Sequence, residues 1–235
     1  MKVGDSINAD NANWTFSGET SKSFDQHVSK SVPFYHEAHD LIAKISDFFL
    51  QNGSICYDLG CSTGELTRLL ATRNSKKDVQ FIAIDKEEGM VKEARRKCKN
   101  FKSVKVIKTD LIEIDYEKAD LIVSNYTMQF IKPENRQILF DRICSALNWG
   151  GGFLLFEKVR APDARFQDMM TAIYTDYKIE QGYSAGEIVS KTKSLKGVLE
   201  PFSTQGNLDL LKRAGFVDVV TVMKYACFEG FLAIK

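Results

Sequence analysis

The sequence predicts an α/β fold built on a doubly wound, mostly parallel sheet of seven strands. From residue 53 onward, short apolar runs alternate with longer amphipathic segments, as in strands joined by crossover helices. The run 119–124 (ADLIVS) is apolar at its centre, as expected for a parallel strand covered on both faces. The last two apolar segments, 216–223 and 226–234, are expected to form an antiparallel pair.

Local signals predict the remaining elements. The other strands are expected at 55–59, 81–85, 104–108 and 153–156. Helices are expected at 24–30, 33–50, 65–72, 87–99, 133–147 and 203–214, with two more between 163 and 199. Pro33 suits the first position of a helix, where an N–H is not needed. Ser184 and Glu187 form the S-x-x-E pattern of a capping box, so one helix is expected to begin just after Ser184.

Composition argues against several classes of protein. The formal net charge is +1, so no overall field favours nucleic acid or a membrane surface. The five cysteines are widely spaced and include no C-x-x-C, which predicts reduced thiols and no zinc site. The N-terminus has no apolar signal core, and no apolar run reaches membrane-spanning length. We therefore expect a cytoplasmic protein that binds neither membranes nor nucleic acid directly.

The stretch 55–64 (ICYDLGCSTG) predicts a strand, a turn of small residues and the start of a helix. Gly60, Ser62 and Gly64 would let the backbone approach a ligand closely. The free N–H groups of the helix would point at the same place. Ser62 replaces the second glycine of the dinucleotide pattern G-x-G-x-x-G, and Asp58 precedes the turn. The stretch therefore indicates a nucleotide-type binding turn.

Polar residues follow several of the predicted strands at the same end. The Gly60 turn, Asp85, Asp110 and Asn125 each come where a strand ends. Open α/β sheets bind ligands at this edge. Asp85 comes 25 residues after Gly60, near the distance at which an acid accepts hydrogen bonds from ribose hydroxyls. A strand-end aspartate can also be a simple helix cap, but its distance from the turn favours the ribose role.

In this order, the features resemble class I S-adenosylmethionine-dependent enzymes, and most closely the carboxy-S-adenosylmethionine synthase family. The resemblance runs from Trp14 to Lys235 and rests on Trp14-x-Phe16, Ser31-Val32-Pro33-x-Tyr35, Tyr57 to Ser62, Ile82 to Asp85, Asn125-x-Thr127-x-Gln129-Phe130, Glu157-Lys158 and Gly182-Tyr183-Ser184-x-x-Glu187-Ile188. It implies a Rossmann-like fold and S-adenosyl-L-methionine as the cofactor. The cofactor contacts that it implies are Tyr35, Gly60, Cys61, Ser62, Asp85, Lys86, Asp110, Leu111 and Asn125.

One position departs from that family. Its members carry an arginine directly after a lysine in the helix that follows the Gly-Tyr-Ser turn, and this arginine binds the extra carboxylate. Here the run is Lys191-Thr192-Lys193, so a threonine replaces the arginine. Threonine cannot form the two parallel hydrogen bonds of a guanidinium. Lys193 lies one helical step, about 100°, further on and would point elsewhere.

We therefore expect a methyltransferase that uses S-adenosylmethionine and acts on a small-molecule acceptor. Two alternatives stay open. The first is a carboxy-S-adenosylmethionine synthase, or another enzyme that converts S-adenosylmethionine itself, linked to tRNA wobble-uridine modification. The second is a non-catalytic protein that binds S-adenosylmethionine.

Methyl transfer mainly requires positioning of the acceptor and exclusion of water. Tyr35, Tyr126 and Tyr183 are candidates to contact the sulfonium through their aromatic faces, and His36 or Glu157 is a candidate base. His36 and His39 would share one helix face, but no acidic or cysteine partner has the matching spacing. We therefore expect no metal site.

The length predicts one domain, 1–235. Its parts would be an N-terminal cap (1–52), a cofactor-binding core (53–160), a helical lid or dimer arm (161–200), and the last helix with the strand pair (201–235). The segment 161–200 interrupts the strand–helix alternation, which is why a lid or arm is expected there. Together with the family resemblance, this segment suggests a homodimer.

Overall fold

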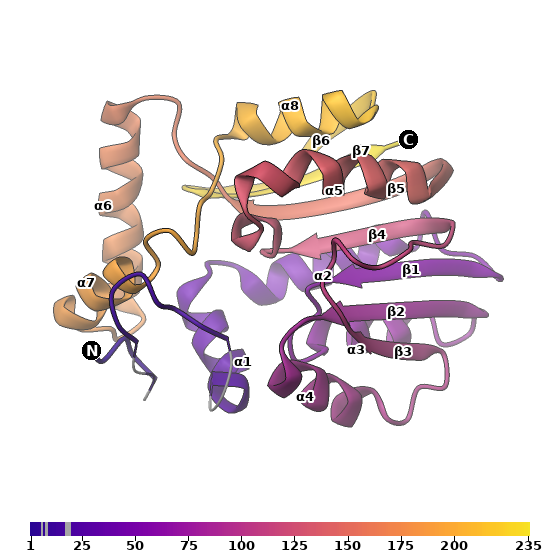
Figure 1. Ribbon diagram of the computed structural model, residues 1–235, viewed down its shortest axis with the longest axis horizontal. Helices are drawn as coiled ribbons and strands as arrows, with labels where there is room; N and C mark the ends of the chain where they lie inside the picture. Colours follow the sequence, from indigo (N-terminus) through magenta and orange to yellow (C-terminus); the bar gives the residue numbers. More distant parts are fainter. Residues whose placement is uncertain (6, 8, 17–19) are drawn as a thin grey trace.

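The computed structural model describes residues 1–5, 7, 9–16 and 20–235, and it confirms the expected α/β fold (Figure 1). The strands are β1 (Ser54–Leu59), β2 (Val79–Asp85), β3 (Val104–Lys108), β4 (Ala119–Asn125), β5 (Leu147–Lys158), β6 (Asp218–Tyr225) and β7 (Phe228–Ile234). Their order in the seven-stranded sheet is β3-β2-β1-β4-β5-β7-β6. Pairings from β3 to β5 are parallel, whereas β7 is antiparallel to both β5 and β6. The antiparallel strand β7 is therefore internal, and β3 and β6 are the two edge strands.

Helices cover both faces of the sheet. In the described ranges they are α1 (Thr20–Ser31), α2 (Tyr35–Ser46), α3 (Glu65–Arg73), α4 (Glu88–Cys98), α5 (Pro133–Ala146), α6 (Ala164–Glu180), α7 (Ala185–Ser194) and α8 (Thr204–Ala214), with a 3₁₀ turn at Met128–Phe130. Helices α5 and α8 pack on one face, where Phe140 meets Phe153 of β5. Helices α2 and α3 pack on the other face, around Ile42 and Leu70.

Two elements differ from the sequence-based expectation. Helix α2 begins at Tyr35, because Phe34 adopts a left-handed conformation (φ 56°) that a helix starting at Pro33 could not contain. Strand β5 begins at Leu147, ahead of the expected start at residue 153, and includes the glycine run 150–152. A Cβ at Gly152 would lie 2.8 Å from the Phe49 ring, so glycine lets α2's C-terminal turn pack on this strand.

The end signals of the later helices behave as expected. Ser184 and Glu187 form the capping box of α7 with both reciprocal hydrogen bonds. Ser203 caps α8, and Gly215 ends it with φ 107°, a conformation that favours glycine. These boundaries could be predicted because caps depend on a few adjacent residues.

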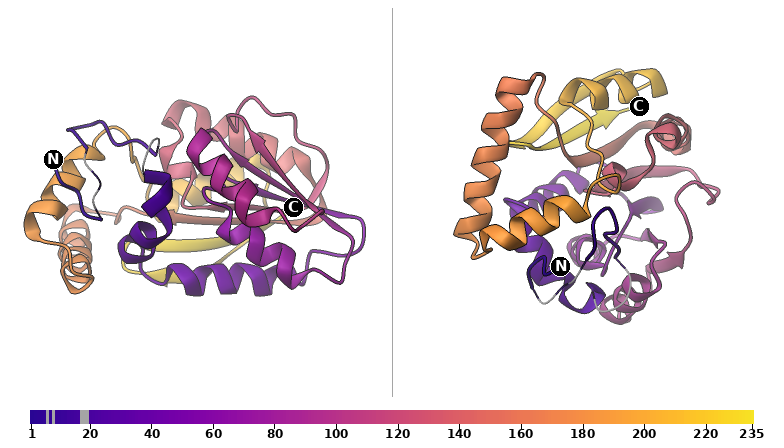
Figure 2. Two further views of the ribbon diagram at one scale, coloured as in Figure 1. Left: turned by 90° about the horizontal axis from the view of Figure 1, so that it is seen from below. Right: turned by 60° about the vertical axis from the view of Figure 1, so that its left-hand side comes forward.

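Helices α6 and α7, called the lid helices below, lie at the carboxyl ends of the parallel strands together with α1 and the N-terminal segment. Figures 1 and 2 show this group on one side of the sheet, with the lid helices facing α1. Among the described helices, none is long and apolar enough to cross a membrane. The arrangement gathers segments from both ends of the chain around one edge of the sheet.

Candidate active site

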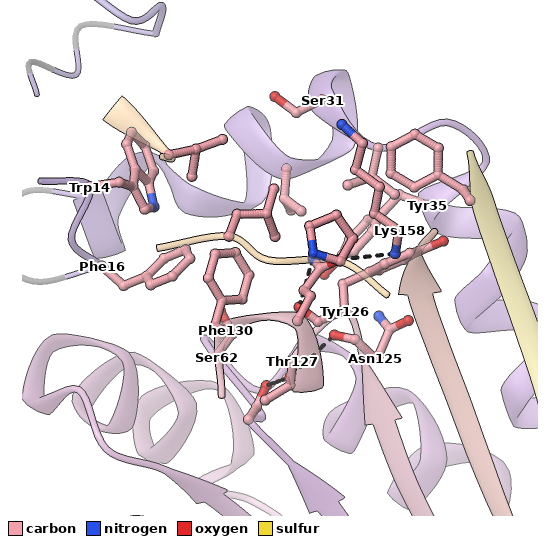
Figure 3. A pocket seen from close by; sticks show the side chains of 18 of the residues that line it. Trp14, Phe16, Ser31, Tyr35, Ser62, Asn125, Tyr126, Thr127, Phe130 and Lys158 are labelled. Atoms are coloured by element: carbon pink, nitrogen blue, oxygen red, sulfur yellow. Dashed lines mark hydrogen bonds between the residues drawn. The ribbon is translucent and has the colours of Figure 1, made fainter. Parts of the chain in front are cut away.

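A cavity of about 690 Å³ lies at this edge of the sheet. The ends of β1, β2 and β4 contribute to its wall, and α1, the lid helices and the segment around Trp14 and Phe16 (the N-terminal arm) enclose it. Figure 3 shows Trp14 and Phe16 on one side of the cavity, with Tyr35 and Lys158 on the other. Small-molecule sites typically measure about 300–1,000 Å³, so the cavity has room for a nucleoside and a second small molecule.

The turn after β1 brings backbone against the cavity. Gly60 has φ +73°, and a Cβ there would collide with the side chain of Thr127. The N–H groups of Gly60 and Cys61 both donate to the carbonyl of Ile84, which ties the turn to β2. Glycine is thus required at position 60 both by the backbone conformation and by the close approach of Thr127.

Gly64 serves a different purpose from that expected. It also has a positive φ, +78°, but a Cβ there would lie 2.9 Å from the Cα of Ala94 in α4. Gly64 is not among the residues that line the cavity. Its small size therefore permits α3 and α4 to pack closely, which is a helix-packing role.

Asp85 ends β2 inside the cavity wall. Its carboxylate accepts hydrogen bonds from the N–H groups of Ser62 and Glu87, each at 2.9 Å. Burial raises its pKa, and the two N–H donors oppose that rise. Each carboxylate oxygen can accept a further hydrogen bond, so Asp85 can bind ribose hydroxyls while it holds the turn.

Asn125 is the last residue of β4, and one polar atom of its side chain has no hydrogen-bond partner among the described residues. Its Nδ2 lies 2.9 Å from His39 Nε2, whereas its buried Oδ1 has no hydrogen-bond partner among the described residues. Asp58 also lines the cavity, accepts a hydrogen bond from Thr67, and has its pKa raised to about 6 by burial. An unpaired buried acceptor and a carboxylate in the lining of the same cavity suit a ligand with an ammonium group.

These groups fit S-adenosylmethionine. Asn125 and Asp58 would accept from its amino group, and Asp85 would accept from its ribose hydroxyls. Tyr35 supplies an aromatic face near the same place, with its ring 4.3 Å from that of His39. Aromatic faces bind sulfonium and ammonium cations favourably.

Three further residues of the cavity lining are lysines: Lys158 at the end of β5, Lys178 in α6 and Lys191 in α7, together called the lysine wall. Lys178 is only 8% exposed. The Nζ atoms of Lys158 and Lys178 lie 4.2 and 4.3 Å from the ring centroid of Tyr174, and Lys191 lies against the Trp14 ring. None of the three forms a salt bridge with a described carboxylate.

Burial and mutual repulsion act on these ammonium groups. Burial, with the nearby charge of Lys158, lowers the pKa of Lys178 to about 8. Burial, with the charge of Lys178, lowers the pKa of Lys191 to about 6. Burial also lowers the pKa of Lys158. A bound anion would oppose these shifts and favour the charged form of the three lysines, none of which has a salt-bridged carboxylate among the described residues.

Comparison with known proteins agrees with this geometry. A family profile described as "Methyltransferase domain" matches residues 56–151. Carboxy-S-adenosyl-L-methionine synthase of Sulfurimonas denitrificans is 40% identical over 94% of this chain and 94% of its own length. The synthase of Staphylococcus epidermidis is 35% identical over 94% of this chain and 97% of its own length. The chain belongs to the carboxy-S-adenosyl-L-methionine synthase family.

Solved structures support the fold of this family member. A putative S-adenosylmethionine-dependent methyltransferase of Methanococcus maripaludis has a TM-score of 0.62 at 19% identity, covering 99% of this chain and 97% of that one. Human N-acetylserotonin methyltransferase in complex with SAM has a TM-score of 0.63 at 16% identity, covering 92% of this chain and 55% of that one. At these identities the likeness shows the fold alone.

The position at which this family member departs from the expected pattern lies at the lysine wall. Thr192 lines the cavity, but its hydroxyl donates to the carbonyl of Ile188 within its own helix. Lys191 faces the cavity, whereas Lys193 is exposed and absent from the lining. Of the two lysines adjacent to Thr192, only Lys191 therefore lines the cavity.

The N-terminal arm closes the cavity through aromatic and ionic contacts. Phe16 packs edge-on against Phe130, with ring centroids 4.9 Å apart. Asp5 accepts hydrogen bonds from Tyr183, at 2.6 Å, and Lys30, and lies 2.8 Å from His27. The N-terminal arm thus both packs against the body of the protein and lines the cavity.

The structure brings most of the expected site residues together. The lining includes Tyr35, Asp58, Gly60, Cys61, Ser62, Asp85, Lys86, Asp110, Leu111, Asn125 and Tyr126. Gly64, His36 and Tyr183 lie outside it. His36 is exposed on α2, whereas Tyr183 is buried and anchors the arm through Asp5. Their catalytic roles stay predictions without geometric support.

Other features of the site could not be found from local patterns. Lys158 belongs to a quoted motif but had no assigned role, and Lys178 resembles any other charged residue of a helix.

Over the described parts of the chain, no group of three potential ligands could hold a metal ion. Glu157, the residue before Lys158, is buried, and its Oε1 has no partner among the described residues. Burial raises the pKa of Glu157 to about 8, although Arg136 opposes that rise.

Proposed function

We propose that this protein, an S-adenosylmethionine-dependent enzyme, makes carboxy-S-adenosyl-L-methionine, the activity for which its relatives are named. The supporting observation is the lysine wall. S-adenosylmethionine carries a sulfonium cation, and lysine ammonium groups without a salt-bridged carboxylate in the same cavity would repel it. An anionic second reactant would compensate them. A carboxylate donor is such a reactant.

When bound, the cofactor supplies a methyl group whose C–H bonds the adjacent sulfonium acidifies. The chain's residues bind, orient and shield it. Asp85 and Asn125 hold the two ends of the cofactor, while Tyr35 faces its positive charge. The N-terminal arm and lid helices keep water from the reactants, which favours transfer between them over loss to solvent.

A second candidate is methyl transfer to a small anionic acceptor. The observation that favours it is Thr192, whose hydroxyl is engaged with Ile188 and cannot bind an added carboxylate as an arginine would. Both candidates need the same cofactor site and the same anion-binding lysines. They differ in whether the sulfonium keeps its methyl carbon.

Mass spectrometry of the nucleoside products separates these candidates. The purified protein is incubated with S-adenosylmethionine, with and without prephenate. A carboxylated sulfonium that forms only with prephenate supports the synthase. S-adenosylhomocysteine together with a methylated acceptor would overturn it in favour of the methyltransferase.

We also propose a cytoplasmic homodimer that acts without direct contact to nucleic acid or membranes. The five cysteines are free and buried, which suits a reducing compartment. The lid helix α6 exposes large apolar side chains at Phe166, Met169 and Ile173, all more than 40% exposed. Their spacing places them on one helix face, which a second copy could cover. Light scattering of the wild type and of Met169→Lys tests this: a monomeric wild type would contradict it.

A further inference from the structure

We propose that His39 is a positioning residue of the cofactor site: it accepts a hydrogen bond from Asn125 Nδ2 and so keeps Asn125 Oδ1 free to bind the amino group of S-adenosylmethionine. The two residues come from different elements, His39 from α2 and Asn125 from the end of β4. The inference rests on the cofactor-binding part of the proposed function. It needs no particular second reactant, so it applies to both candidate reactions.

Only one of the two histidines of α2 borders the cavity. His39 lines the cavity and is 4% exposed, whereas His36 is exposed and lies outside the lining. His39 follows Tyr35 by four residues, a spacing that places both side chains on one face of the helix. Their ring centroids lie 4.3 Å apart. His39 is therefore held by packing beside the aromatic ring that faces the cofactor's positive charge.

The hydrogen bond fixes the tautomer of the His39 imidazole. Asn125 Nδ2 lies 2.9 Å from His39 Nε2. An amide nitrogen can donate a hydrogen bond but cannot accept one, so Nε2 must carry no proton and must be the acceptor. The imidazole is therefore neutral, with its proton on Nδ1. Because Nε2 is already engaged by Asn125, this arrangement argues against His39 as a general base.

The surroundings of His39 favour this neutral form. Burial is the largest influence and, together with the charge of His36 on the same helix, lowers the pKa of His39 to about 4. Glu65 of α3 and Asp25 of α1 raise this pKa, whereas Lys97 of α4 lowers it. Lys97 forms salt bridges with both acids, so part of their charge is compensated. His39 therefore stays neutral at physiological pH.

The neutral histidine decides which end of the Asn125 amide is left for the cofactor. The two ends have nearly the same shape, so hydrogen-bond partners select between them. A protonated Nε2 would donate to Oδ1 and leave the Nδ2 donor, which cannot bind an ammonium group. With Nε2 as the acceptor, the buried Oδ1 has no partner among the described residues. That oxygen is then left to accept from the amino group of the cofactor.

The test compares wild type with His39→Leu, which removes the acceptor but keeps a side chain of similar size. His36→Leu is the matched control, because His36 lies on the same helix but is exposed and does not line the cavity. Each protein is titrated calorimetrically with S-adenosylmethionine and with an analogue that lacks only the α-amino group. Thermal melts show whether each variant folds.

We expect His39→Leu to bind S-adenosylmethionine about tenfold more weakly, as for the loss of a hydrogen bond to a charged group. It should bind the analogue as tightly as wild type does, since the analogue has no ammonium group. His36→Leu should bind both ligands like wild type. In an Asn125→Ala background, His39→Leu should cause no further loss, because His39 acts through Asn125. A purely structural role of His39 would weaken the binding of both ligands alike.

Nuclear magnetic resonance tests the tautomer in the wild-type protein. The chain has three histidines, so their ring-nitrogen signals can be assigned by their loss in His36→Leu and His39→Leu. Correlation of the ring nitrogens with the ring protons distinguishes a protonated nitrogen from an unprotonated one. At neutral pH we expect His39 to carry a proton on Nδ1 and none on Nε2.

Four outcomes would overturn the inference: wild-type affinity for S-adenosylmethionine in His39→Leu, an equal loss of affinity for the analogue, additive losses with Asn125→Ala, or a protonated Nε2. The product assay separates this inference from the proposed function. If the binding results are as expected but no carboxylated product forms, the proposed function fails and the role of His39 stands. If wild type forms that product and His39→Leu binds the cofactor normally, the role of His39 fails and the function stands.

Discussion

Replacing Gly60 by alanine should damage the cofactor turn far more than an ordinary glycine replacement. Two costs follow from the structure. The first is conformational: at φ +73° an alanine pays about 1–2 kcal/mol for the left-handed backbone. The second is steric: the new Cβ would lie 2.8 Å from the Cβ of Thr127, closer still to the rest of that side chain. Overpacking of this kind costs about 1–3 kcal/mol.

Gly150→Ala provides the matched control. Gly150 has nearly the same φ, +76°, but nothing lies within 4 Å of the position that the added methyl group would occupy. A chain of this size loses roughly 2–4 °C in melting temperature per kcal/mol. The control should therefore melt about 2–8 °C below wild type, and Gly60→Ala about 4–20 °C below.

The affinity for S-adenosylmethionine should distinguish the two variants more clearly than the melting temperature does. Any shift of the turn or of Thr127 moves groups that border the cavity, so Gly60→Ala should bind S-adenosylmethionine at least about tenfold more weakly. Gly150→Ala should bind it like wild type. Calorimetry and thermal melts measure both effects. If the two variants melt alike and both keep wild-type affinity, the close approach of Thr127 does not shape the cofactor site.

Asp85→Asn should weaken S-adenosylmethionine binding about tenfold or more and should lower the melting temperature. The reason is that one amide oxygen must replace the two carboxylate oxygens that accept hydrogen bonds from Ser62 and Glu87. An unchanged calorimetric affinity would show that Asp85 does not bind the ribose. Thr192→Arg should raise the affinity for carboxy-S-adenosylmethionine about tenfold, since the arginine restores a bidentate hydrogen-bond donor. If competition binding shows no gain in affinity, Lys191 already binds the added carboxylate. Glu157 has its pKa raised from 4.5 to about 8, so its contribution to stability is present below pH 4.5 and is lost as the pH rises through 8. Relative to Glu157→Gln, wild type should therefore lose melting temperature between about pH 5 and pH 9, and parallel melting curves for the two proteins would contradict the raised pKa.

Much of the cofactor side of the site could be predicted because its signals are local. Gly60, Asp85, Asp110 and Asn125 each lie where a strand ends, and parallel strands bring their ends to one edge. Once the strands are recognised, the site follows without knowledge of distant contacts. The exception was Gly64, since the sequence cannot show that its neighbour would be a helix instead of a ligand.

Element boundaries failed where packing overrides a local pattern. Pro33 is a good first residue for a helix, yet the left-handed Phe34 delays α2 to Tyr35. Glycines usually interrupt a strand, yet Gly152 lies within β5 because the Phe49 ring occupies the space above it. Neither outcome follows from the residues adjacent in sequence.

The reactant side of the site is a product of tertiary structure. In the sequence, Lys178 is an ordinary charged residue of a helix. In the structure, α6 lies across the end of β5, and Lys178 lies over the Tyr174 ring together with Lys158. This changes how Thr192 should be interpreted. Judged alone, the loss of an arginine argues against a bound carboxylate. Within the cavity it removes one cationic side chain from a lining that keeps three lysines, one of them the adjacent Lys191. A carboxylate can therefore still bind after arginine is replaced by threonine. It would be held by flexible lysine ammonium groups instead of by the rigid, two-donor guanidinium of an arginine.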